Sequence, residues 1–174
     1  MKIKIFITTV LSVSMCGVLF AQNPKLPEKV QNVTVKDLDG KATQIPQFGE
    51  KNLLIFYIDP DKHKQNEAFT YELEANGRAA GENIMGLGII NLKDAPMVPN
   101  ALARSLAKKR TEKNGATVLA DETGAVRDSW KLGDCNNMFV LLVVSKEGEL
   151  VYCKKGELSN ADKEEFYEFI QAYR

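Results

Sequence analysis

The sequence predicts an α/β fold in which helices flank a mixed central sheet and a β-hairpin extends that sheet at its N-terminal side. Apolar runs of strand length alternate with segments of helical spacing, a pattern typical of parallel strands joined by right-handed crossovers. The last two expected strands are separated by a short turn at 145–148, so they pair antiparallel and make the sheet mixed. The length of 174 residues suits one domain.

Residues 1–21 have the pattern of a secretory signal peptide. Lys2 and Lys4 form a basic start, residues 5–20 are apolar or small, and Ala21 offers a small residue at the cleavage position. The sixteen apolar or small residues fall short of the roughly 20 that a membrane-spanning helix needs. We therefore expect this segment to be cleaved and not to serve as an anchoring helix.

Cleavage after Ala21 would give a secreted chain, most simply a periplasmic one, with no transmembrane segment. Lipid attachment at Cys16 is an alternative, but Met15 is bulky where lipoprotein signals carry a small residue. Cleavage removes two of the 23 Lys and Arg and none of the 23 Asp and Glu, so the net charge becomes 21 − 23 = −2. A nucleic-acid binder would carry a basic excess, and no nucleic-acid partner is expected.

The N-terminal part of the secreted chain predicts a lead-in followed by a hairpin. Residues 22–30 form a polar, proline-bearing lead-in, and residues 31–174 are expected to form the domain. Alternation at 33–35 predicts a strand. The Asp-Gly step within 37–41 predicts a tight turn, because aspartate and glycine tolerate positive φ. A second strand at 43–45 would complete this N-terminal hairpin.

The remaining elements follow from the period and length of each apolar pattern. Strands are expected at 53–58, 83–90, 116–120, 138–144 and 149–153. Helices are expected at 62–76, 100–110, 123–132 and 159–173. Leu102 and Leu106 have helical spacing in the second of these helices. The basic residues at its end, within 108–113, are interpreted as a solvated helix terminus, with a partner contact as the alternative.

Several short motifs occur in a recognisable order along the chain. They lie at 37–41 (Asp-Leu-Asp-Gly-Lys), 56–61 with 64–67, 89–95, 119–124 with 130–132, 143–148 and 155–159. Together they resemble the YtfJ-type family of secreted or periplasmic proteins, which is a group within the thioredoxin- and peroxiredoxin-like superfamily. The resemblance covers nearly the whole chain after residue 21 and implies a thioredoxin-like fold.

The junction where such proteins do their chemistry lacks the expected groups. Thioredoxin-like oxidoreductases carry Cys-x-x-Cys where the first long strand enters its helix, because the helix start lowers the pKa of the attacking thiol. Residues 59–64 read Asp-Pro-Asp-Lys-His-Lys, and no proline follows Pro99 to supply the cis-proline of the family. The sequence thus predicts a domain without the dithiol site and without a cofactor, a binding or accessory protein of the cell envelope. The groove for its protein or small-molecule partner is expected to consist of Asp59, Pro60, Asp61, His63, Asn136, Asn137 and Met138.

The two cysteines outside the expected signal peptide are the basis of an enzymatic alternative. Cys135 could serve a one-cysteine thiol oxidoreductase or peroxidase, although the adjacent Asp134 opposes thiolate formation. If the last hairpin has its tip at 146–147, Cys153 faces Val140. That position lies about 16 Å along the sheet from Cys135, at about 3.3 Å per residue. A disulfide cannot cross this separation unless the chain folds back, so both thiols are expected to be free.

A weaker alternative is a metal-binding accessory protein. His63 and Glu67 are four residues apart and would share one face of the helix expected at 62–76. The competing interpretation is a solvated helix start that is capped by the side chain of Asp61. We favour the cap, because acidic helix starts are common for electrostatic reasons.

Overall fold

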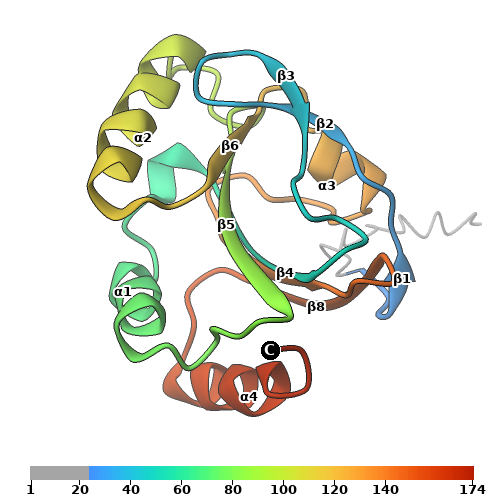
Figure 1. Ribbon diagram of the computed structural model, residues 1–174. Helices are drawn as coiled ribbons and strands as arrows, with labels where there is room; N and C mark the ends of the chain where they lie inside the picture. Colours follow the sequence, from blue (N-terminus) through green and yellow to red (C-terminus); the bar gives the residue numbers. More distant parts are fainter. Residues whose placement is uncertain (1–23) are drawn as a thin grey trace, which may run out of the picture.

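The computed structural model describes residues 24–174, so the segment interpreted as a signal peptide, 1–21, lies outside the described residues. Within them, eight strands form one sheet in the order β1-β8-β7-β4-β5-β6-β2-β3 (Figure 1). The strands are β1 (Glu28–Lys29), β2 (Thr34–Lys36), β3 (Ala42–Gln44), β4 (Asn52–Ile58), β5 (Ile84–Asn91), β6 (Val118–Asp121), β7 (Phe139–Val144) and β8 (Glu149–Lys155). The helices are η1 (Pro60–Lys62), α1 (Glu67–Asn76), α2 (Asn100–Asn114), α3 (Ala125–Ser129) and α4 (Asn160–Ile170).

The sheet is mixed, as the alternation of strands and helices predicted. Strands β4, β5 and β6 run parallel, and β7 lies antiparallel to β4 and to β8. Strand β4 therefore lies between two partners, and helices or loops cover both of its faces. This position explains why its residues are apolar without alternation, as in other strands that are buried on both faces.

The two faces of the sheet carry separate cores. On one face, Ile55 and Leu142 pack with Trp130 of the α3 segment and with residues of the N-terminal segment. On the other face, α1 and α4 contribute Phe69 and Phe166, whose rings meet edge to face at a centroid distance of 5.7 Å. Figure 1 shows α1 and α4 on one side of the sheet and α3 on the other. The expected α/β fold is thus confirmed.

The N-terminal hairpin is present, and its turn is built as the sequence predicted. Strands β2 and β3 pair antiparallel with Val35 opposite Thr43. The Asp37 Oδ1 atom accepts N–H groups of Asp39 and Lys41 at 3.0 and 2.8 Å, and Gly40 has φ +84°. The lead-in expected at 22–30 contains β1, which the sequence analysis did not predict and which pairs with β8.

The helix expected at 62–76 is divided in two. The 3₁₀ turn η1 is followed by a bend, and α1 begins only at Glu67 because Asn66 has a left-handed φ of 60°. The Asn66 side chain explains the break: its Nδ2 donates to the carbonyl of Gly156, and its Oδ1 accepts the N–H of Leu158, both at 2.9 Å. This asparagine ties the start of α1 to the loop before α4.

The register of the last hairpin differs from the prediction. Cys153 lies opposite Leu142 and not opposite Val140. The turn shifts the pairing by one residue, so that Val144 faces Leu150, and an irregularity between Val143 and Val144 shifts it by one more. The turn itself is at 145–148, where the N–H of Gly148 donates to the carbonyl of Ser145 at 2.9 Å. Both described cysteines are free thiols, as predicted, although the register used for that prediction was wrong.

Helix α2 packs over one end of the sheet through a small contact. Ala103 meets Leu92 and Ala120 in a third, minor core. Figure 1 shows α2 at the outside of the molecule, separate from α1 and α4. Among the described residues, no helix combines the length and the apolar character needed to cross a bilayer.

Candidate functional site

The end of β4 is organised by one buried carboxylate, that of Asp59. Its side chain has no exposed surface. Oδ1 accepts the N–H of Asp61 at 2.9 Å, and Oδ2 accepts the N–H of Asn137 at 2.8 Å. The Asp59 N–H in turn donates to the carbonyl of Met138 at 3.0 Å. Asp59 therefore joins the loop after β4 to the loop before β7, and both loops belong to the expected groove.

The cap at this helix start is Asp59, so the prediction that Asp61 is the cap was wrong. Asp61 supplies the N–H that Asp59 accepts, and its own side chain is exposed. A carboxylate that accepts backbone N–H groups at the first turn is stabilised by the partial positive charge there. Asp59 occupies this position at the end of the strand because Pro60 begins η1 directly after it.

The other residues expected in the groove lie at the surface around this junction. Pro60 and Met138 are half-buried, whereas Asn136 and Asn137 are exposed. Asn137 has a left-handed φ of 55°, and its side-chain amide donates to the Asn136 Oδ1 atom at 3.1 Å. The structure thus brings Asp59, Asn137 and Met138 together by direct contact.

The expected metal pair of His63 and Glu67 is not on one helix. His63 follows η1, and its Nδ1 atom lies 2.9 Å from the carbonyl oxygen of Pro60. Glu67 begins α1 after the bend at Asn66, so the four-residue spacing does not place the two side chains on a shared helical face. In the part of the chain that the structure describes, no three His, Cys, Asp or Glu side chains are grouped to hold a metal ion.

Cys135 lies in the core and not in an accessible loop position. Its side chain is fully buried with Val126, Trp130 and Leu142, and its thiol is 3.6 Å from the carbonyl oxygen of Gly133. Burial raises the pKa of the Cys135 thiol to about 12. Burial likewise raises the pKa of the Cys153 thiol to about 11. Both thiols are therefore protonated at neutral pH, and a protonated thiol is a poor nucleophile.

A second buried carboxylate, Asp121, organises the neighbouring end of β6. It accepts the N–H groups of Gly124, Ala125 and Val126 at 2.8 to 2.9 Å, at the start of α3. The Tyr57 hydroxyl lies 3.3 Å from Asp121 Oδ2. Burial, followed by the charge of Asp121, holds the pKa of Tyr57 well above its ordinary value. Asp121 thus fixes the position of α3 relative to β4.

Arg127 of α3 lies in the middle of an ion-pair network that the sequence analysis did not predict. It pairs with Asp94, which follows β5, and its Nε donates to Asp128 at 2.8 Å. The hydrogen bond to Asp128 raises the pKa of Arg127, and the same contact lowers the pKa of Asp128. Gly124 has φ +79°, which favours glycine, and a Cβ there would lie 3.0 Å from the Arg127 guanidinium. The Asp-x-x-Gly spacing of 121–124 is a local signal for the Asp121 cap at the start of α3, but it does not indicate the pairing of Arg127 with Asp94.

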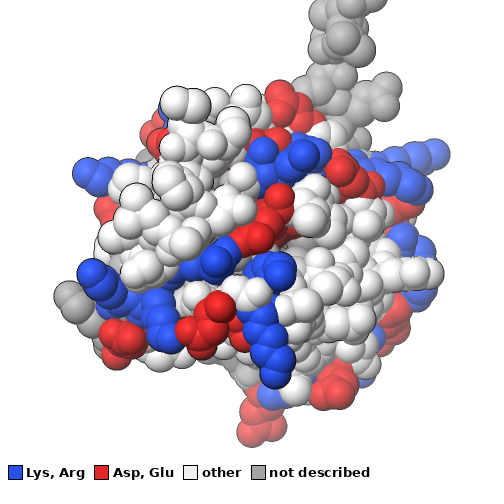
Figure 2. All heavy atoms as spheres, turned by 90° about the horizontal axis from the view of Figure 1, so that it is seen from above, with Lys and Arg blue, Asp and Glu red and all other residues white. Residues whose placement is uncertain are grey.

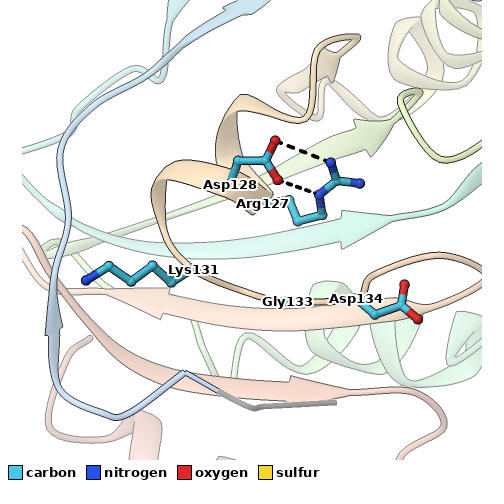
Figure 3. Close-up of a pocket in the computed structure, with 5 residues that line it drawn as sticks. All are labelled: Arg127, Asp128, Lys131, Gly133 and Asp134. Atoms are coloured by element: carbon cyan, nitrogen blue, oxygen red, sulfur yellow. Dashed lines mark hydrogen bonds and ion pairs between the residues drawn. The ribbon is translucent and has the colours of Figure 1, made fainter. Parts of the chain in front are cut away.

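A surface depression of about 570 Å³ lies beside this network and next to the groove loop. Its lining residues are Arg127, Asp128, Lys131, Gly133 and Asp134. Figure 3 shows the Arg127 and Asp128 side chains facing each other, with Lys131 and Asp134 extending toward opposite sides. The Asp134 carboxylate accepts the N–H of Asn136 at 3.0 Å, which links the depression to the groove.

These features make the carboxyl ends of β4, β5 and β6 one polar edge of the sheet. In open α/β sheets, ligands bind beyond the carboxyl ends of the parallel strands. The edge offers exposed amides at Asn136 and Asn137 together with charged groups of both signs in the depression. Such groups can hold a polar ligand or a protein segment. The residues that line the depression include no cysteine.

Comparison with known proteins identifies the family. A family model described as "Bacterial protein of unknown function (YtfJ_HI0045)" matches residues 12–173. No curated protein matches the chain.

Solved structures similar to this chain have the thioredoxin-like fold. A DsbF homologue from Corynebacterium diphtheriae is 11% identical, with 95% of this chain and 99% of that chain covered and a TM-score of 0.62. A peroxiredoxin-like protein from Aquifex aeolicus is 14% identical, with coverage of 88% and 90% and a TM-score of 0.57. The exposed lipoprotein thioredoxin of Streptococcus pneumoniae is 16% identical, with coverage of 82% and 99% and a TM-score of 0.54. The fold is therefore thioredoxin-like, and the match over residues 12–173 means that the chain belongs to the YtfJ family of bacterial proteins.

Proposed function

We propose that this protein is a binding or accessory protein of the bacterial cell envelope that does not carry out thiol–disulfide exchange. The buried carboxylate of Asp59 carries the proposal. It takes the position where β4 enters η1, and each of its oxygens accepts a backbone N–H, from Asp61 and from Asn137. A carboxylate can hold two loops together, but it cannot accept a disulfide sulfur and release it again as a thiolate can.

The cysteines support the same conclusion. An attacking thiol needs a depressed pKa and access to its substrate. Cys135 has neither, because its side chain is fully buried and its pKa is raised to about 12. A one-cysteine enzyme would therefore have to open its core in every turnover, which argues against the enzymatic alternative.

The binding surface of this proposal is the groove at Asp59 and 136–138 together with the depression next to it. Asp59 fixes the two loops of the groove, and Asp121 fixes the start of α3 beside the depression. Surfaces that are ordered before binding lose less conformational entropy when a partner arrives. Charges of both signs favour a polar ligand or a protein segment over an apolar one.

A location in the cell envelope is part of the proposal. It is supported by the signal-peptide pattern of residues 1–21. It is also supported by the similarity to the pneumococcal protein, which is described as an exposed lipoprotein. Recovery of the native protein from the periplasm with Gln22 at its N-terminus would support the location, and an N-terminal Met1 would contradict it.

The test of the chemistry is a disulfide reduction assay with dithiothreitol as electron donor and insulin as substrate. We expect the wild-type chain and a Cys135→Ala variant to give the same rate as a reaction without protein. A thioredoxin serves as the positive control. Turnover by the wild-type chain that disappears in Cys135→Ala would overturn the proposal and establish the one-cysteine enzyme.

A further inference from the structure

Helix α2 presents Leu102 and Leu106 to solvent and Ala103 to the sheet. Leu102 and Leu106 are 52% and 53% exposed, whereas Ala103 is only 7% exposed. The alanine packs against Leu92 and Ala120. Leucines at this spacing normally form the buried stripe of a helix, so their outward position calls for a partner outside the described fold.

A third exposed apolar side chain lies close to the two leucines in the chain. Met97, two residues before Pro99 and α2, is 91% exposed. Among the described residues, only five large apolar side chains are exposed, and these three are close together in the chain at the start of α2. Contiguous exposed apolar groups of this kind mark interaction surfaces.

The sequence of the same helix carries a net positive charge. The sequence of α2 contains five Lys or Arg residues and one Glu, a net charge of 5 − 1 = +4, in a chain expected to carry −2 after cleavage. Arg104 pairs with Glu122, and Lys108 pairs with Asp39, so the helix together with these two acids has a net charge of 4 − 2 = +2. Lys109 is exposed, and it lies seven residues after Leu102 and three after Leu106, on the same outward stripe.

From these exposed apolar side chains and the charge of this helix, we propose that α2 is a docking surface for an anionic lipid bilayer. Met97, Leu102 and Leu106 enter the boundary between headgroups and acyl chains, and Lys109 contacts the lipid phosphates. A basic helix with an apolar stripe binds in this way by combining apolar burial with attraction to anionic lipids. Lysine suits the boundary because its apolar stem can lie along the acyl chains while its ammonium reaches the headgroups.

The shape of the molecule favours a bilayer over a peptide as the occupant. Helix α2 lies at the outside of the molecule and is not part of a groove between helices (Figure 1). Figure 2 shows uncharged surface on the side where α2 lies, with Lys and Arg at its border. A single protruding helix can rest on a flat surface, whereas recognition of a peptide helix requires a groove. The proposal does not depend on the function proposed for the groove at Asp59.

The test is co-sedimentation with lipid vesicles of a chain that begins at Gln22, because the apolar residues 5–20 would bind lipid by themselves. The elements and cores of the described fold all lie within residues 24–174, so this chain retains them. We expect binding to vesicles of phosphatidylethanolamine and phosphatidylglycerol but not to phosphatidylcholine vesicles, and a loss of binding as salt is raised.

Two variants in α2, one of them a double substitution, and two matched controls make the test specific. Leu102→Glu combined with Leu106→Glu should lower the partition coefficient by roughly tenfold or more, and Lys109→Glu by about fivefold or more. Tyr71→Glu changes an exposed aromatic residue of α1, and Lys146→Glu reverses an exposed charge in the β7–β8 turn. Both controls should bind within about twofold of wild type, because surface changes away from the contact have small effects.

Several results would overturn the proposal. The first is that the wild-type chain does not bind the anionic vesicles at low salt. The second is that it binds both lipid compositions equally. The third is that the variants of Leu102, Leu106 and Lys109 bind as well as the wild type. A wild-type dimer in sedimentation equilibrium that dissociates in the Leu102→Glu, Leu106→Glu variant, without vesicle binding, would assign the face to contact between copies. Thermal unfolding of each variant confirms that it is folded before binding is compared.

Discussion

Replacement of Asp59 by asparagine tests whether the buried carboxylate holds the two groove loops together. Both carboxylate oxygens accept a backbone N–H, from Asp61 and from Asn137. An amide of the same shape offers one acceptor and one donor, so one of these N–H groups would face another donor. The variant loses one hydrogen bond to a charged group, worth about 1.5–3 kcal/mol. Because both donor residues are exposed, water can partly replace the lost acceptor, and we expect a loss of about 2 kcal/mol.

The assay is urea unfolding at neutral pH, with Asp61→Asn as the matched control. Asp61 is exposed, so its conversion should change the free energy of unfolding by less than about 0.5 kcal/mol. For a domain of this size, 2 kcal/mol corresponds to a decrease in Tm of about 4–8 °C. Hydrogen exchange should also show faster exchange of the Asn137 amide in Asp59→Asn. Equal stability of the two variants, with unchanged exchange at Asn137, would refute the role given to Asp59.

Three further predictions concern stability. Between about pH 9 and pH 12, the unfolded chain loses the Cys135 proton while the folded chain, with its pKa of about 12, retains it. Stability should therefore fall in this range by up to about 1.4 kcal/mol per pH unit from this group. Urea unfolding at pH 8 and pH 10 should show a smaller fall in Cys135→Ala, and an identical fall would contradict this. Asn66→Ala should cost about 2–3 kcal/mol in urea unfolding, because it removes two hydrogen bonds and places alanine at a left-handed φ. The exposed Asn136→Ala is its control. An equal loss of unfolding free energy in both variants would contradict the role of Asn66 in holding α1 to the loop before α4. Asp121→Asn should cost about 3 kcal/mol, because three N–H groups and the Tyr57 hydroxyl share this carboxylate; a loss below about 1 kcal/mol in the same assay would contradict it.

The sheet could be predicted from the sequence because buried strands appear there as runs of apolar residues. Central strands such as β4 and β7 are apolar on both faces, and the pattern required no knowledge of the partners. The turn at Asp37 was equally local, because the side chain bonds to backbone groups two and four residues away. Strand β1 has no such pattern in the sequence, since it is only two residues long and forms by pairing with β8.

Features that depend on distant contacts could not be predicted. The residues from 62 to 76 favour a helix throughout, and only the contact of Asn66 with Gly156 and Leu158 explains the bend. The register of β8 depends on an irregularity near Val144 that has no distinctive residue. Cys135 lies in the loop before β7, but its burial could not be predicted, because it depends on how this loop packs over the core, where Lys155 contacts the carbonyl of Asp134 at 3.1 Å.

The candidate site was predicted in part. The absence of cysteine at 59–64 was evident from the sequence, and the grouping of Asp59 with Asn137 agrees with the expected groove. The roles within that group were not predicted, because Asp59 and Asp61 are equally good caps as residue types. The network of Arg127 with Asp94 joins residues that are 33 positions apart, and one sequence gives no signal for such a pair.

The most direct test of the central claim is the reactivity of the thiols in the native chain at pH 7. Under the proposed function, the junction at the end of β4 holds a structural carboxylate, and no thiol of the folded domain is activated. With a pKa of about 12, Cys135 should carry roughly a thousandfold less thiolate than an ordinary cysteine. Peptide-resolved mass spectrometry after treatment with iodoacetamide should find Cys135 unlabelled while glutathione in the same tube reacts to completion, and labelled after unfolding in urea. Labelling of native Cys135 faster than glutathione would contradict the account.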